Sequence, residues 1–326
     1  MQSLLELRDI SKKYNQQSVL QRVSFNVNAG EVFGLLGESG SGKSTLLRIA
    51  AGLIDPDKGE VWLDNQKSRL ASDQLIPGHP DIKIVHQDYN LSAPLTVREN
   101  IAYALRYYEK TYRDERVDEL IQLCHLETVV NHPAKQLSGG EKQRTAIARA
   151  LAEEARVLLL DEPFAHLDLP NRRRLIQTVR ELAEQTGTAC IFVTHDATDA
   201  LSLSHRMGIL REGQLLQIGT PEEVYQQPVN IYAAEITGEV NVFEPNFFLH
   251  YFGPNFLLLN GQVVVRPEAF IIHLQPTEKA TEAIVKRVVF EGSRYLIYLE
   301  TAQQLIKIYH QTSLPLETTV FVEVCS

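Results

Sequence analysis

Apolar and polar side chains follow different periods in successive parts of the chain. In residues 5–10 the two kinds alternate, which is typical of a half-buried strand, and residues 59–63 form a second strand segment. From about 91 to 134 apolar residues such as Ile101 and Leu120 recur at helical intervals. This part of the chain is therefore predicted to hold strands followed by a helical insert.

After residue 138, predicted helices and apolar strands alternate. Helices are expected at residues 141–152, 170–185 and 198–204, strands at 156–160, 188–193, 207–211 and 214–218, and short helices at 221–226 and up to about 236. Strands that alternate with helices of this length indicate a mostly parallel sheet covered on both faces. The predicted fold class is therefore α/β.

From residue 245 onward only short strands are expected. They fall at residues 263–265, 283–290, 295–299, 305–309 and 319–324, separated by glycine, proline and polar turns. Such a series predicts a small all-β barrel or sandwich. Because 326 residues exceed the usual size of one core, we expect two domains, residues 1–238 and residues 239–326, with the helical insert at about 89–136.

Composition narrows the range of partners. The net charge of −9 argues against a broad basic surface for nucleic acid or anionic lipid. No run of 18 uncharged apolar residues is present, and the first residues lack the features of a signal peptide. Three widely spaced cysteines fit a reducing cytoplasm. Contact with a membrane is therefore expected only through a protein partner.

A glycine-rich run between a predicted strand and a predicted helix is the first motif that indicates a chemical function. Residues 37–45 read Gly-Glu-Ser-Gly-Ser-Gly-Lys-Ser-Thr and satisfy the phosphate-loop pattern G-x-x-x-x-G-K-[ST]. Glycines let backbone N–H groups surround a polyphosphate, and the following helix presents its positive end to the anion. We expect Lys43 to reach the β- and γ-phosphates and Ser44 to hold Mg²⁺.

Two acidic residues follow the apolar strand that ends near residue 160. Asp161, at the carboxyl end of this strand and beside the phosphate loop, can hold Mg²⁺ through water. Glu162 points in a different direction and can polarise an attacking water molecule. We therefore expect Asp161 to bind the metal ion and Glu162 to act as the general base.

A second motif at residues 137–144 reads Leu-Ser-Gly-Gly-Glu-Lys-Gln-Arg. With the phosphate loop, it resembles the LSGGQ signature of the ATP-binding-cassette (ABC) ATPases, with Glu141 where glutamine is usual. This resemblance implies a P-loop NTPase core with a helical insert and an antiparallel β subdomain. It also implies ATP hydrolysis with Mg²⁺.

The resemblance assigns four further residues by their positions. His195 matches the switch histidine that touches the γ-phosphate and steadies Glu162. Gln87 matches a glutamine that senses Mg²⁺ and water, and Tyr14 matches an aromatic residue that stacks on adenine. Asp168 matches the aspartate of the family's D-loop.

Two residues depart from the family pattern. His166 stands where a small residue is usual, and Glu38 stands where proline is common in related transporter ATPases. The residues expected to contact ATP are Tyr14, Gly37, Glu38, Ser39, Gly40, Ser41, Gly42, Lys43, Ser44, Thr45, Ser138, Gly139, Gly140 and Asp168. The expected catalytic set is Lys43, Gln87, Glu162 and His195, and the expected Mg²⁺ ligands are Ser44, Gln87 and Asp161.

In ABC ATPases the signature of one subunit caps the phosphate loop of another. Ser138 and Gly140 would then donate hydrogen bonds to the γ-phosphate across an interface. This sequence has one phosphate loop and one signature, and the helical insert separates them. The resemblance therefore implies a homodimer that encloses two ATP molecules.

The resemblance continues beyond the signature. Residues 219–228, residues 238–243 and the Val-Arg-Pro-Glu at 265–268 look like the closing segment and C-terminal TOBE domain, an OB-like β-domain, of sugar, polyamine, ferric-iron and oxyanion importer ATPases. This implies an energising subunit on the cytoplasmic face of a membrane, bound to permease subunits and, through them, to a solute-binding protein. A groove for a permease helix would be lined by Asp88, Tyr89, Asn90, Tyr103, Tyr107 and Tyr108, or the tyrosines would pack within the insert.

Two alternatives remain open. A soluble ABC ATPase of translation or DNA repair is one, although such chains usually carry two cassettes or long coiled-coil inserts. The other is an independent ligand sensor after residue 245, with Arg266, Lys286, Arg287 and Arg294 binding an anion or serving only as surface charge.

Overall fold

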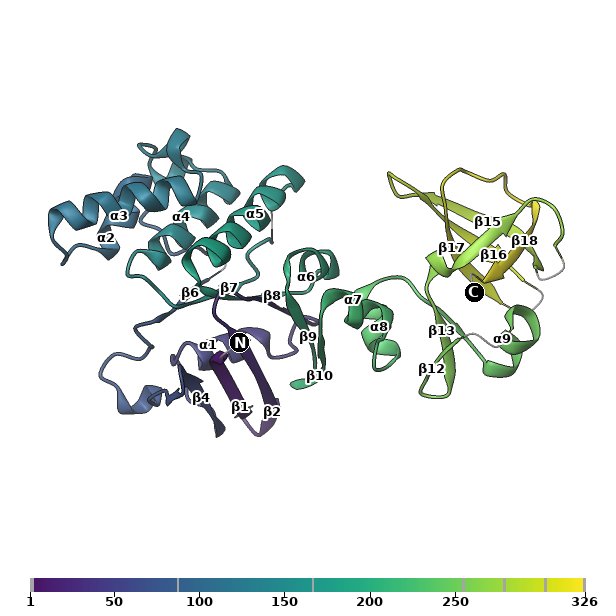
Figure 1. The fold of residues 1–326 in the computed structure, drawn as a ribbon, viewed down its shortest axis with the longest axis horizontal. Coiled ribbons are helices and arrows are strands. Elements are labelled where there is room, and N and C mark those ends of the chain that lie inside the picture. The colour runs from purple at the N-terminus through teal and green to yellow at the C-terminus, as the bar shows by residue number, and fades with distance from the viewer. Residues whose placement is uncertain are drawn as a thin grey trace. The chain divides into compact units, whose positions relative to one another are not determined.

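The computed structural model describes residues 3–86, 88–165, 167–253, 256–277, 280–301 and 304–324. The chain divides into two compact units, Met1–Val224 and Tyr225–Ser326 (Figure 1). This division comes earlier than the boundary expected at residue 238. The reason is local, because Arg266 donates hydrogen bonds to the carbonyls of Tyr225 and Ala234 and so joins residues before 238 to the second unit.

A six-stranded sheet in the order β10-β9-β3-β8-β7-β6 forms the centre of the first unit. Its strands are β3 (Val32–Leu36), β6 (Ile82–Val85), β7 (Val157–Asp161), β8 (Ala189–Thr194), β9 (Arg206–Arg211) and β10 (Gln214–Gly219). All neighbouring pairs are parallel except the hairpin of β9 and β10. The mostly parallel sheet and the last two strands predicted from the sequence are thus confirmed.

Helices cover both faces of this sheet. Those that pack on its strands are α1 (Lys43–Ala50), α4 (Gly139–Leu151), α5 (Leu169–Thr186) and α6 (Ala197–Leu203). In the insert, α2 (Val97–Ala104) packs on α4, and α3 (Lys110–Leu123) packs on α4 and α5. Successive side chains of a strand point to opposite faces. Leu158 and Leu160 of β7 accordingly join the core under α4 and α5, whereas Val157 and Leu159 join the core over α1. Figure 1 shows α1 and α4 on opposite sides of the sheet.

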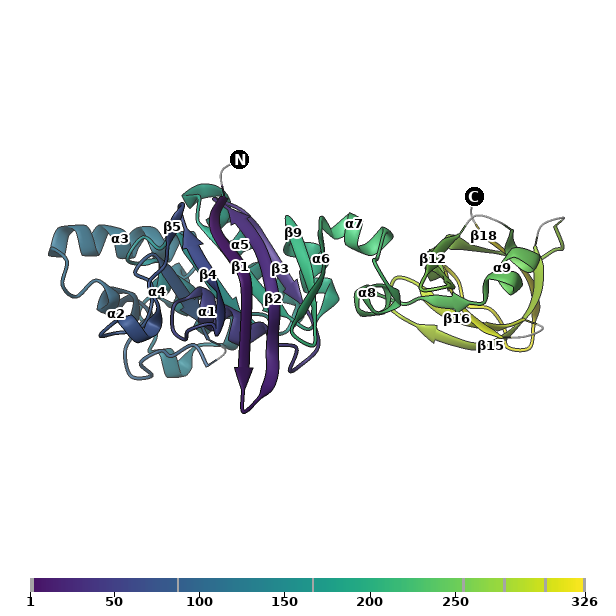
Figure 2. The ribbon, with the colours of Figure 1, turned by 90° about the horizontal axis from the view of Figure 1, so that it is seen from below.

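A second, antiparallel sheet in the order β2-β1-β4-β5 also belongs to the first unit. Its strands are β1 (Ser3–Tyr14), β2 (Gln17–Asn28), β4 (Lys58–Leu63) and β5 (Gln66–Lys67). Figure 2 shows β1 and β2 as a long hairpin, whose turn residues Asn15 and Gln16 have φ values of 48° and 67°. Positive φ at two successive residues is the geometry of a tight hairpin turn. The sequence pattern predicts only part of β1 and does not predict β2.

The second unit holds two antiparallel sheets, β11-β13-β12 and β14-β18-β15-β16-β17. Its elements are α8 (Ile231–Thr237), β11 (Asn241–Phe243), α9 (Pro245–Phe252), β12 (Leu257–Leu259), β13 (Gln262–Val265), β14 (Phe270–His273), β15 (Thr281–Phe290), β16 (Tyr295–Glu300), β17 (Leu305–His310) and β18 (Thr319–Val324). The short helix α7 (Pro221–Gln226) contains the division between the units.

The expectation of strands alone after residue 245 was wrong, because α9 is a helix. Pro245 occupies its first turn, where a missing N–H costs nothing. Phe248 is fully buried and packs against Phe243 at a centroid distance of 5.2 Å. Phe252 packs against Phe270 of β14 at 5.5 Å. An apolar aromatic face thus stabilises a helix against the sheets.

Across the ranges that the structure describes, no helix combines the length and the apolar character needed to cross a membrane.

Candidate active site

Three neighbouring parallel strands bring the predicted catalytic segments to one edge of the sheet. Leu36 at the end of β3 pairs with Thr194 of β8, and Asp161 at the end of β7 pairs with Val193. Gly37 N–H donates to the carbonyl of Thr194 across 3.2 Å. The phosphate loop, the acidic pair and the histidine segment therefore leave the sheet side by side.

The backbone of the phosphate loop requires glycine at two positions. Gly42 precedes α1 with φ of 105°, and a Cβ there would lie 2.7 Å from the carbonyl oxygen of Val19. A Cβ at Gly37 would lie 2.3 Å from the carbonyl oxygen of Leu210. Within the described residues no side chain caps α1, so its first N–H groups are available to an anion.

Lys43 lies over this loop and is nearly buried, with 5% of its surface exposed. Its Nζ donates hydrogen bonds to the carbonyls of Gly37 at 2.7 Å and Glu38 at 2.8 Å. Burial lowers the pKa of Lys43, while the nearby carboxylates of Glu162 and Asp161 act in the opposite direction. The ammonium is thus held beside the loop, where the charge of a polyphosphate would balance it.

The side chains of Ser44 and Asp161 meet at the base of the loop. Ser44 Oγ donates to Asp161 Oδ1 across 2.9 Å. A hydroxyl and a carboxylate are hard oxygen ligands, which Mg²⁺ prefers, and this ion usually takes its remaining ligands from water and substrate phosphates. The two residues therefore fit the Mg²⁺ site expected from the sequence.

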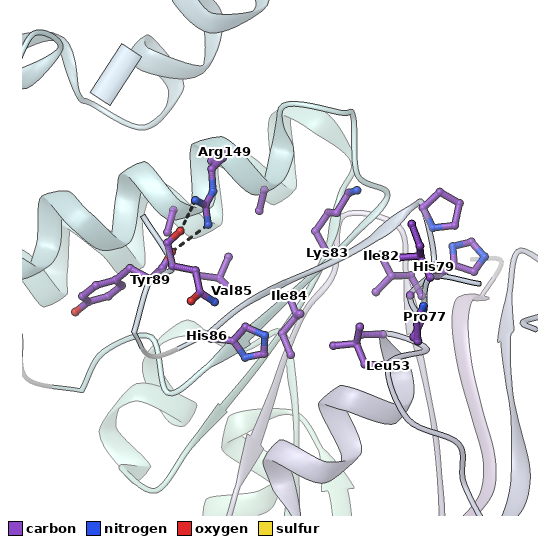
Figure 3. Close-up of a pocket in the computed structure, with 17 residues that line it drawn as sticks. Leu53, Pro77, His79, Ile82, Lys83, Ile84, Val85, His86, Tyr89 and Arg149 are labelled. Carbon is purple, nitrogen blue, oxygen red and sulfur yellow. Dashed lines mark hydrogen bonds between the residues drawn. The ribbon is translucent and has the colours of Figure 1, made fainter. Parts of the chain in front are cut away.

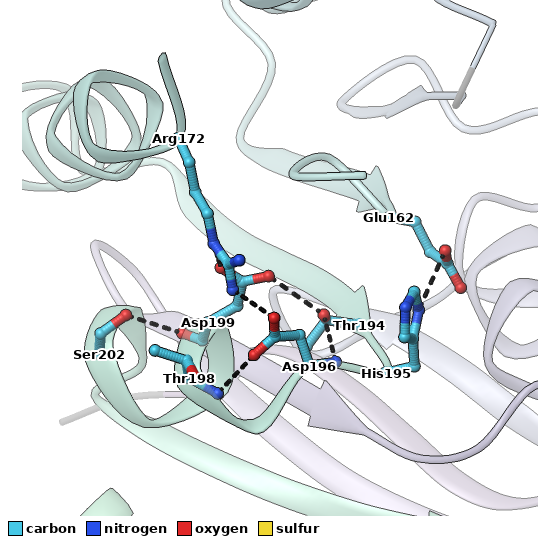
Figure 4. A network of polar contacts seen from close by, with 8 residues as sticks. All are labelled: Glu162, Arg172, Thr194, His195, Asp196, Thr198, Asp199 and Ser202. Carbon is cyan, nitrogen blue, oxygen red and sulfur yellow. Dashed lines mark hydrogen bonds and ion pairs between the residues drawn. The ribbon is translucent and has the colours of Figure 1, made fainter. Parts of the chain in front are cut away.

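Glu162 and His195 form the next contact (Figure 4). His195 Nδ1 lies 3.3 Å from Glu162 Oε2, and the histidine side chain is 61% exposed while that of Glu162 is 27% exposed. Glu162 has φ of 47°, an uncommon left-handed conformation outside glycine. This turn directs Glu162 away from the strand path that Asp161 still follows.

The signature begins α4, and a capping box fixes its first turn. Ser138 Oγ and Ser138 N–H both donate to Glu141 Oε2 at 2.8 Å. Glu141 can therefore complete the capping box of α4, just as the more usual glutamine would. A Cβ at Gly140 would lie 2.9 Å from Asn171, and one at Gly139 would lie 3.3 Å from Leu167, so the signature glycines lie against the start of α5.

The predicted site residues fall into two groups. The phosphate loop, Asp161, Glu162 and His195 form the first. Ser138, Gly139 and Gly140 form the second with Asp168, whose side chain accepts a hydrogen bond from Asn171 N–H at 3.0 Å and so caps α5. Their helix α4 lies on the face of the sheet opposite α1.

Tyr14 lies at the end of β1 with 46% of its surface exposed. The facing strand β2 reaches the phosphate loop, since Val19 and Leu20 lie against Gly42. The tyrosine is thus on the hairpin that reaches the loop, with its ring partly exposed and the Lys12 ammonium 5.7 Å from the ring centroid. Gln87 and His166 lie outside the described residues.

Two sets of contacts made by arginine side chains near these segments were not predicted from the sequence. Arg172 of α5 binds the carboxylates of Asp196 and Asp199, which follow His195. Arg149 of α4 donates to the carbonyls of Asn90 at 2.5 Å and Tyr89 at 3.2 Å. The only signal in the sequence was the nearness of Asp196 and Asp199 to His195.

The four cations proposed as an anion sensor all have partners within the protein. Arg266 is surrounded by acceptors, since it donates to three backbone carbonyls and to the Thr237 hydroxyl. Lys286 pairs with Glu300 and Glu317, Arg294 lies beside Glu291, and Arg287 stacks on Tyr298. Arg266 in particular has a structural role.

Comparison with known proteins gives the family. The ABC transporter family model matches residues 20–165. The spermidine/putrescine import ATP-binding protein PotA of Thermotoga maritima is 43% identical over 242 residues, covering 74% of this chain and 65% of that protein. The putrescine transport ATP-binding protein PotG of Escherichia coli (strain K12) is 41% identical over 243 residues, covering 74% and 63%. The chain thus spans just under two thirds of the length of these relatives.

Solved structures agree with this result. The dimeric ATP-binding cassette MJ0796 with bound ADP and Pi has a TM-score of 0.59 and 33% identity, covering 67% of this chain and 99% of that one. The structure of cbiO1 from Clostridium perfringens, part of the transporter complex cbiONQ, has a TM-score of 0.65 and 27% identity, covering 70% and 92%. With its phosphate loop, strand-end acids and signature in the expected places, the chain belongs to the ABC transporter family as an ATP-binding cassette.

Proposed function

We propose that this chain hydrolyses MgATP to energise a membrane importer, acting as a homodimer bound to permease subunits on the cytoplasmic face. The observation that carries this proposal is the arrangement at the sheet edge, where Lys43, the Ser44–Asp161 pair and the Glu162–His195 pair adjoin one loop. Phosphoryl transfer needs mainly positioning and charge neutralisation, and these groups supply both.

The groups of the site have distinct roles in the proposed reaction. Lys43 neutralises the β- and γ-phosphates, and Ser44 and Asp161 hold the Mg²⁺, which supplies further positive charge to the same phosphates. Glu162 accepts a hydrogen bond from the attacking water and orients it, while His195 keeps Glu162 in place and contacts the γ-phosphate. Tyr14 provides the stacking surface for adenine, and Gln87 is assigned to Mg²⁺ and water by resemblance alone.

The signature completes the site from a second chain. In one chain α4 and α1 lie on opposite faces of the sheet, which supports sharing between two copies. Ser138 and the N–H groups near Gly140 would then bind the γ-phosphate of the partner's ATP. The Ser138 hydroxyl donates to Glu141 in the free chain, so binding redirects one existing hydrogen bond. The dimeric state of MJ0796 supports a dimer of this chain as well.

A groove beside the helical insert is the proposed docking place for a permease helix (Figure 3). It has a volume of about 410 Å³ and lies between the strand β6 and the helix α4. Leu53, Ile82 and Val85 line it together with Tyr89 and Arg149. Apolar and polar groups contribute about equally to its lining, which suits the two faces of an amphipathic helix.

Three of the tyrosines expected to line this groove are not among its lining residues. Tyr107 is 85% exposed and Tyr103 is 58% exposed, and the Arg106 guanidinium stacks on both rings at 4.5 and 4.6 Å. Tyr108 instead stacks with Tyr112 at 5.6 Å. Tyr89 alone of the four belongs to the groove, so Tyr89→Ala is expected to weaken permease binding and Tyr107→Ala serves as its control.

Residues 239–326, which make up most of the second unit, are proposed to form a TOBE-like regulatory domain after a nucleotide-binding domain of residues 1–238. The two antiparallel sheets of the second unit support this reading.

The proposal is tested by isolating the tagged chain from its own host. We expect it to sediment with membranes, to purify in detergent with integral membrane subunits, and to be required for uptake of a solute. Spermidine and putrescine are the first solutes to test, because the relatives are named for them. Recovery with ribosomes or DNA and no effect on uptake would support the soluble alternative instead.

A further inference from the structure

A cluster of charges joins the start of α5 to the segment that carries His195 (Figure 4). Arg172 Nε donates to Asp199 Oδ1 across 2.5 Å, and Arg172 Nη2 lies 2.6 Å from Asp196 Oδ2. The Asp199 side chain is only 3% exposed, so its charge is balanced by Arg172 rather than by water. One guanidinium thus holds two carboxylates at once.

The same cluster fixes the backbone on both sides of His195. Thr194 Oγ1 accepts a hydrogen bond from Asp196 N–H at 3.0 Å and donates to Asp199 Oδ2 at 3.4 Å. Asp196 also accepts from Thr198 N–H at 2.7 Å and caps α6. His195 is therefore held between two residues that belong to one bonded network.

The imidazole of His195 receives little support from packing because most of its surface is exposed. Its contact with Glu162 at 3.3 Å depends on where the backbone places it. In enzymes, a displacement of about 1 Å can lower the rate about 10²-fold. A residue that fixes this backbone can thus influence hydrolysis without touching the nucleotide.

We propose that Arg172 is a positioning residue that keeps His195 beside Glu162 by binding Asp196 and Asp199. The inference rests on the proposed ATPase function. Arg172 also links two parts of the cassette. It directly follows Asn171, which lies against Gly140, and it is one helical turn from Asp168, the N-cap residue of α5. Movement at the start of α5 would be carried to His195 through Arg172.

The test compares four variants with the unaltered full chain. Arg172→Met removes the guanidinium, Arg172→Lys keeps the charge without the two-armed geometry, and Asp196→Asn weakens the ion pair but preserves an N-cap residue. Arg173→Met changes the adjacent exposed arginine on the same helix and serves as the matched control. For each variant kcat and KM for MgATP, nucleotide affinity and urea unfolding are measured.

We expect Arg172→Met to lower kcat about tenfold or more while nucleotide affinity changes less than about threefold. Arg172→Lys should recover part of the rate, Asp196→Asn should lower it several-fold, and Arg173→Met should match the unaltered chain. If Arg172→Met fails to fold, Arg172→Lys and Asp196→Asn still test the proposal. Unchanged kcat in both of these would overturn the proposal.

A double-mutant cycle separates positioning of His195 from general stabilisation. Single-turnover hydrolysis of radiolabelled ATP, with enzyme in excess, is measured for His195→Ala alone and combined with Arg172→Lys. If Arg172 acts through His195, the second substitution has little further effect. An equal loss in both backgrounds would overturn the proposal. An unaltered chain that hydrolyses no ATP would instead refute the proposed function itself.

Discussion

Ser44 and Asp161 are 117 residues apart in the sequence, yet Ser44 Oγ donates to Asp161 Oδ1 across 2.9 Å. The contact joins the first turn of α1 to the end of β7. It forms because β3 and β7 both flank β8 in parallel, so their carboxyl ends open on the same edge of the sheet. This geometry is the basis for the proposed metal site.

Replacing Asp161 by Asn should therefore raise the Mg²⁺ concentration needed for half-maximal hydrolysis. The expected increase is roughly tenfold or more, because a charged oxygen ligand is lost while the side-chain shape is kept. The measurement is hydrolysis at fixed ATP over a range of Mg²⁺ concentrations. Asp118→Asn, on the exposed surface of α3, is the control. An unchanged Mg²⁺ requirement would remove Asp161 from the site.

Lys43→Ala should abolish tight nucleotide binding. Lys43 is nearly buried beside the loop carbonyls, and loss of a charge-assisted contact to phosphate weakens binding by about 10- to 100-fold. Equilibrium titration with a fluorescent ATP analogue measures the effect. Lys110→Ala, at the exposed start of α3, should bind normally. Retained affinity in Lys43→Ala would contradict the phosphate-loop assignment.

Arg266→Ala should destabilise the second unit. Arg266 donates to the carbonyls of Tyr225, Ala234 and Glu239 and to the Thr237 hydroxyl, and it stacks 4.0 Å from the Tyr225 ring. Leaving several of these acceptors unpaired should lower the free energy of unfolding by about 2–4 kcal/mol.

Urea unfolding followed by the fluorescence of the tyrosines provides the measurement for this variant. Arg287→Ala removes an exposed arginine that stacks on Tyr298 and should cost less than about 0.5 kcal/mol. Equal stability of the two variants would show that Arg266 is only a surface charge.

Stability should depend on pH through Asp199. Burial raises the pKa of Asp199 to about 6, although Arg172 opposes this change. The folded chain then holds a proton on Asp199 at pH 5 that the unfolded chain, with an ordinary Asp pKa, does not hold. The contribution of Asp199 to stability is therefore greatest below the unfolded pKa and is lost as pH rises through about 6.

The comparison with Asp199→Asn isolates this contribution, because asparagine does not titrate. Between pH 7 and pH 5 the unaltered chain should gain about 1 kcal/mol relative to the variant. Urea unfolding of both proteins at the two pH values gives the difference. A difference that stays constant would mean that the pKa of Asp199 is not raised in the folded chain, and a change in the opposite direction would mean that it is lowered.

Features encoded by nearby residues could be predicted from the sequence. The phosphate loop and the signature depend on glycines and caps within a few positions, and the insert shows a helical period. The capping box of Thr96 and Glu99 at the start of α2 is present as its spacing indicates. The parallel sheet followed from the alternation of strands and helices.

Features that depend on distant residues could not be predicted. The β1–β2 hairpin contains register shifts between Ile10 and Lys12 and between Lys12 and Lys13, in the part of β1 beyond the predicted residues 5–10. The helix α9 depends on aromatic contacts with later strands. Arg172 appears in the sequence only as part of a basic run, and its partners Asp196 and Asp199 become apparent only when α5 packs beside the end of β8.

Glu162→Gln tests the chemical step. The substitution keeps the shape of the side chain but removes the base, so hydrolysis should fall by about 10²- to 10⁴-fold while ATP still binds. The measurements are turnover and nucleotide affinity of the same preparation. Near-normal turnover would exclude Glu162 as the base.

The most direct test of the account is the dependence of steady-state MgATP hydrolysis on protein concentration, measured together with the size of the Glu162→Gln variant with and without ATP. Because the signature and the phosphate loop of one chain lie on opposite faces of the sheet, we expect activity to rise more steeply than concentration and the variant to dimerise with ATP. Activity strictly proportional to concentration, from a chain that stays monomeric with ATP, would contradict a site shared between two chains.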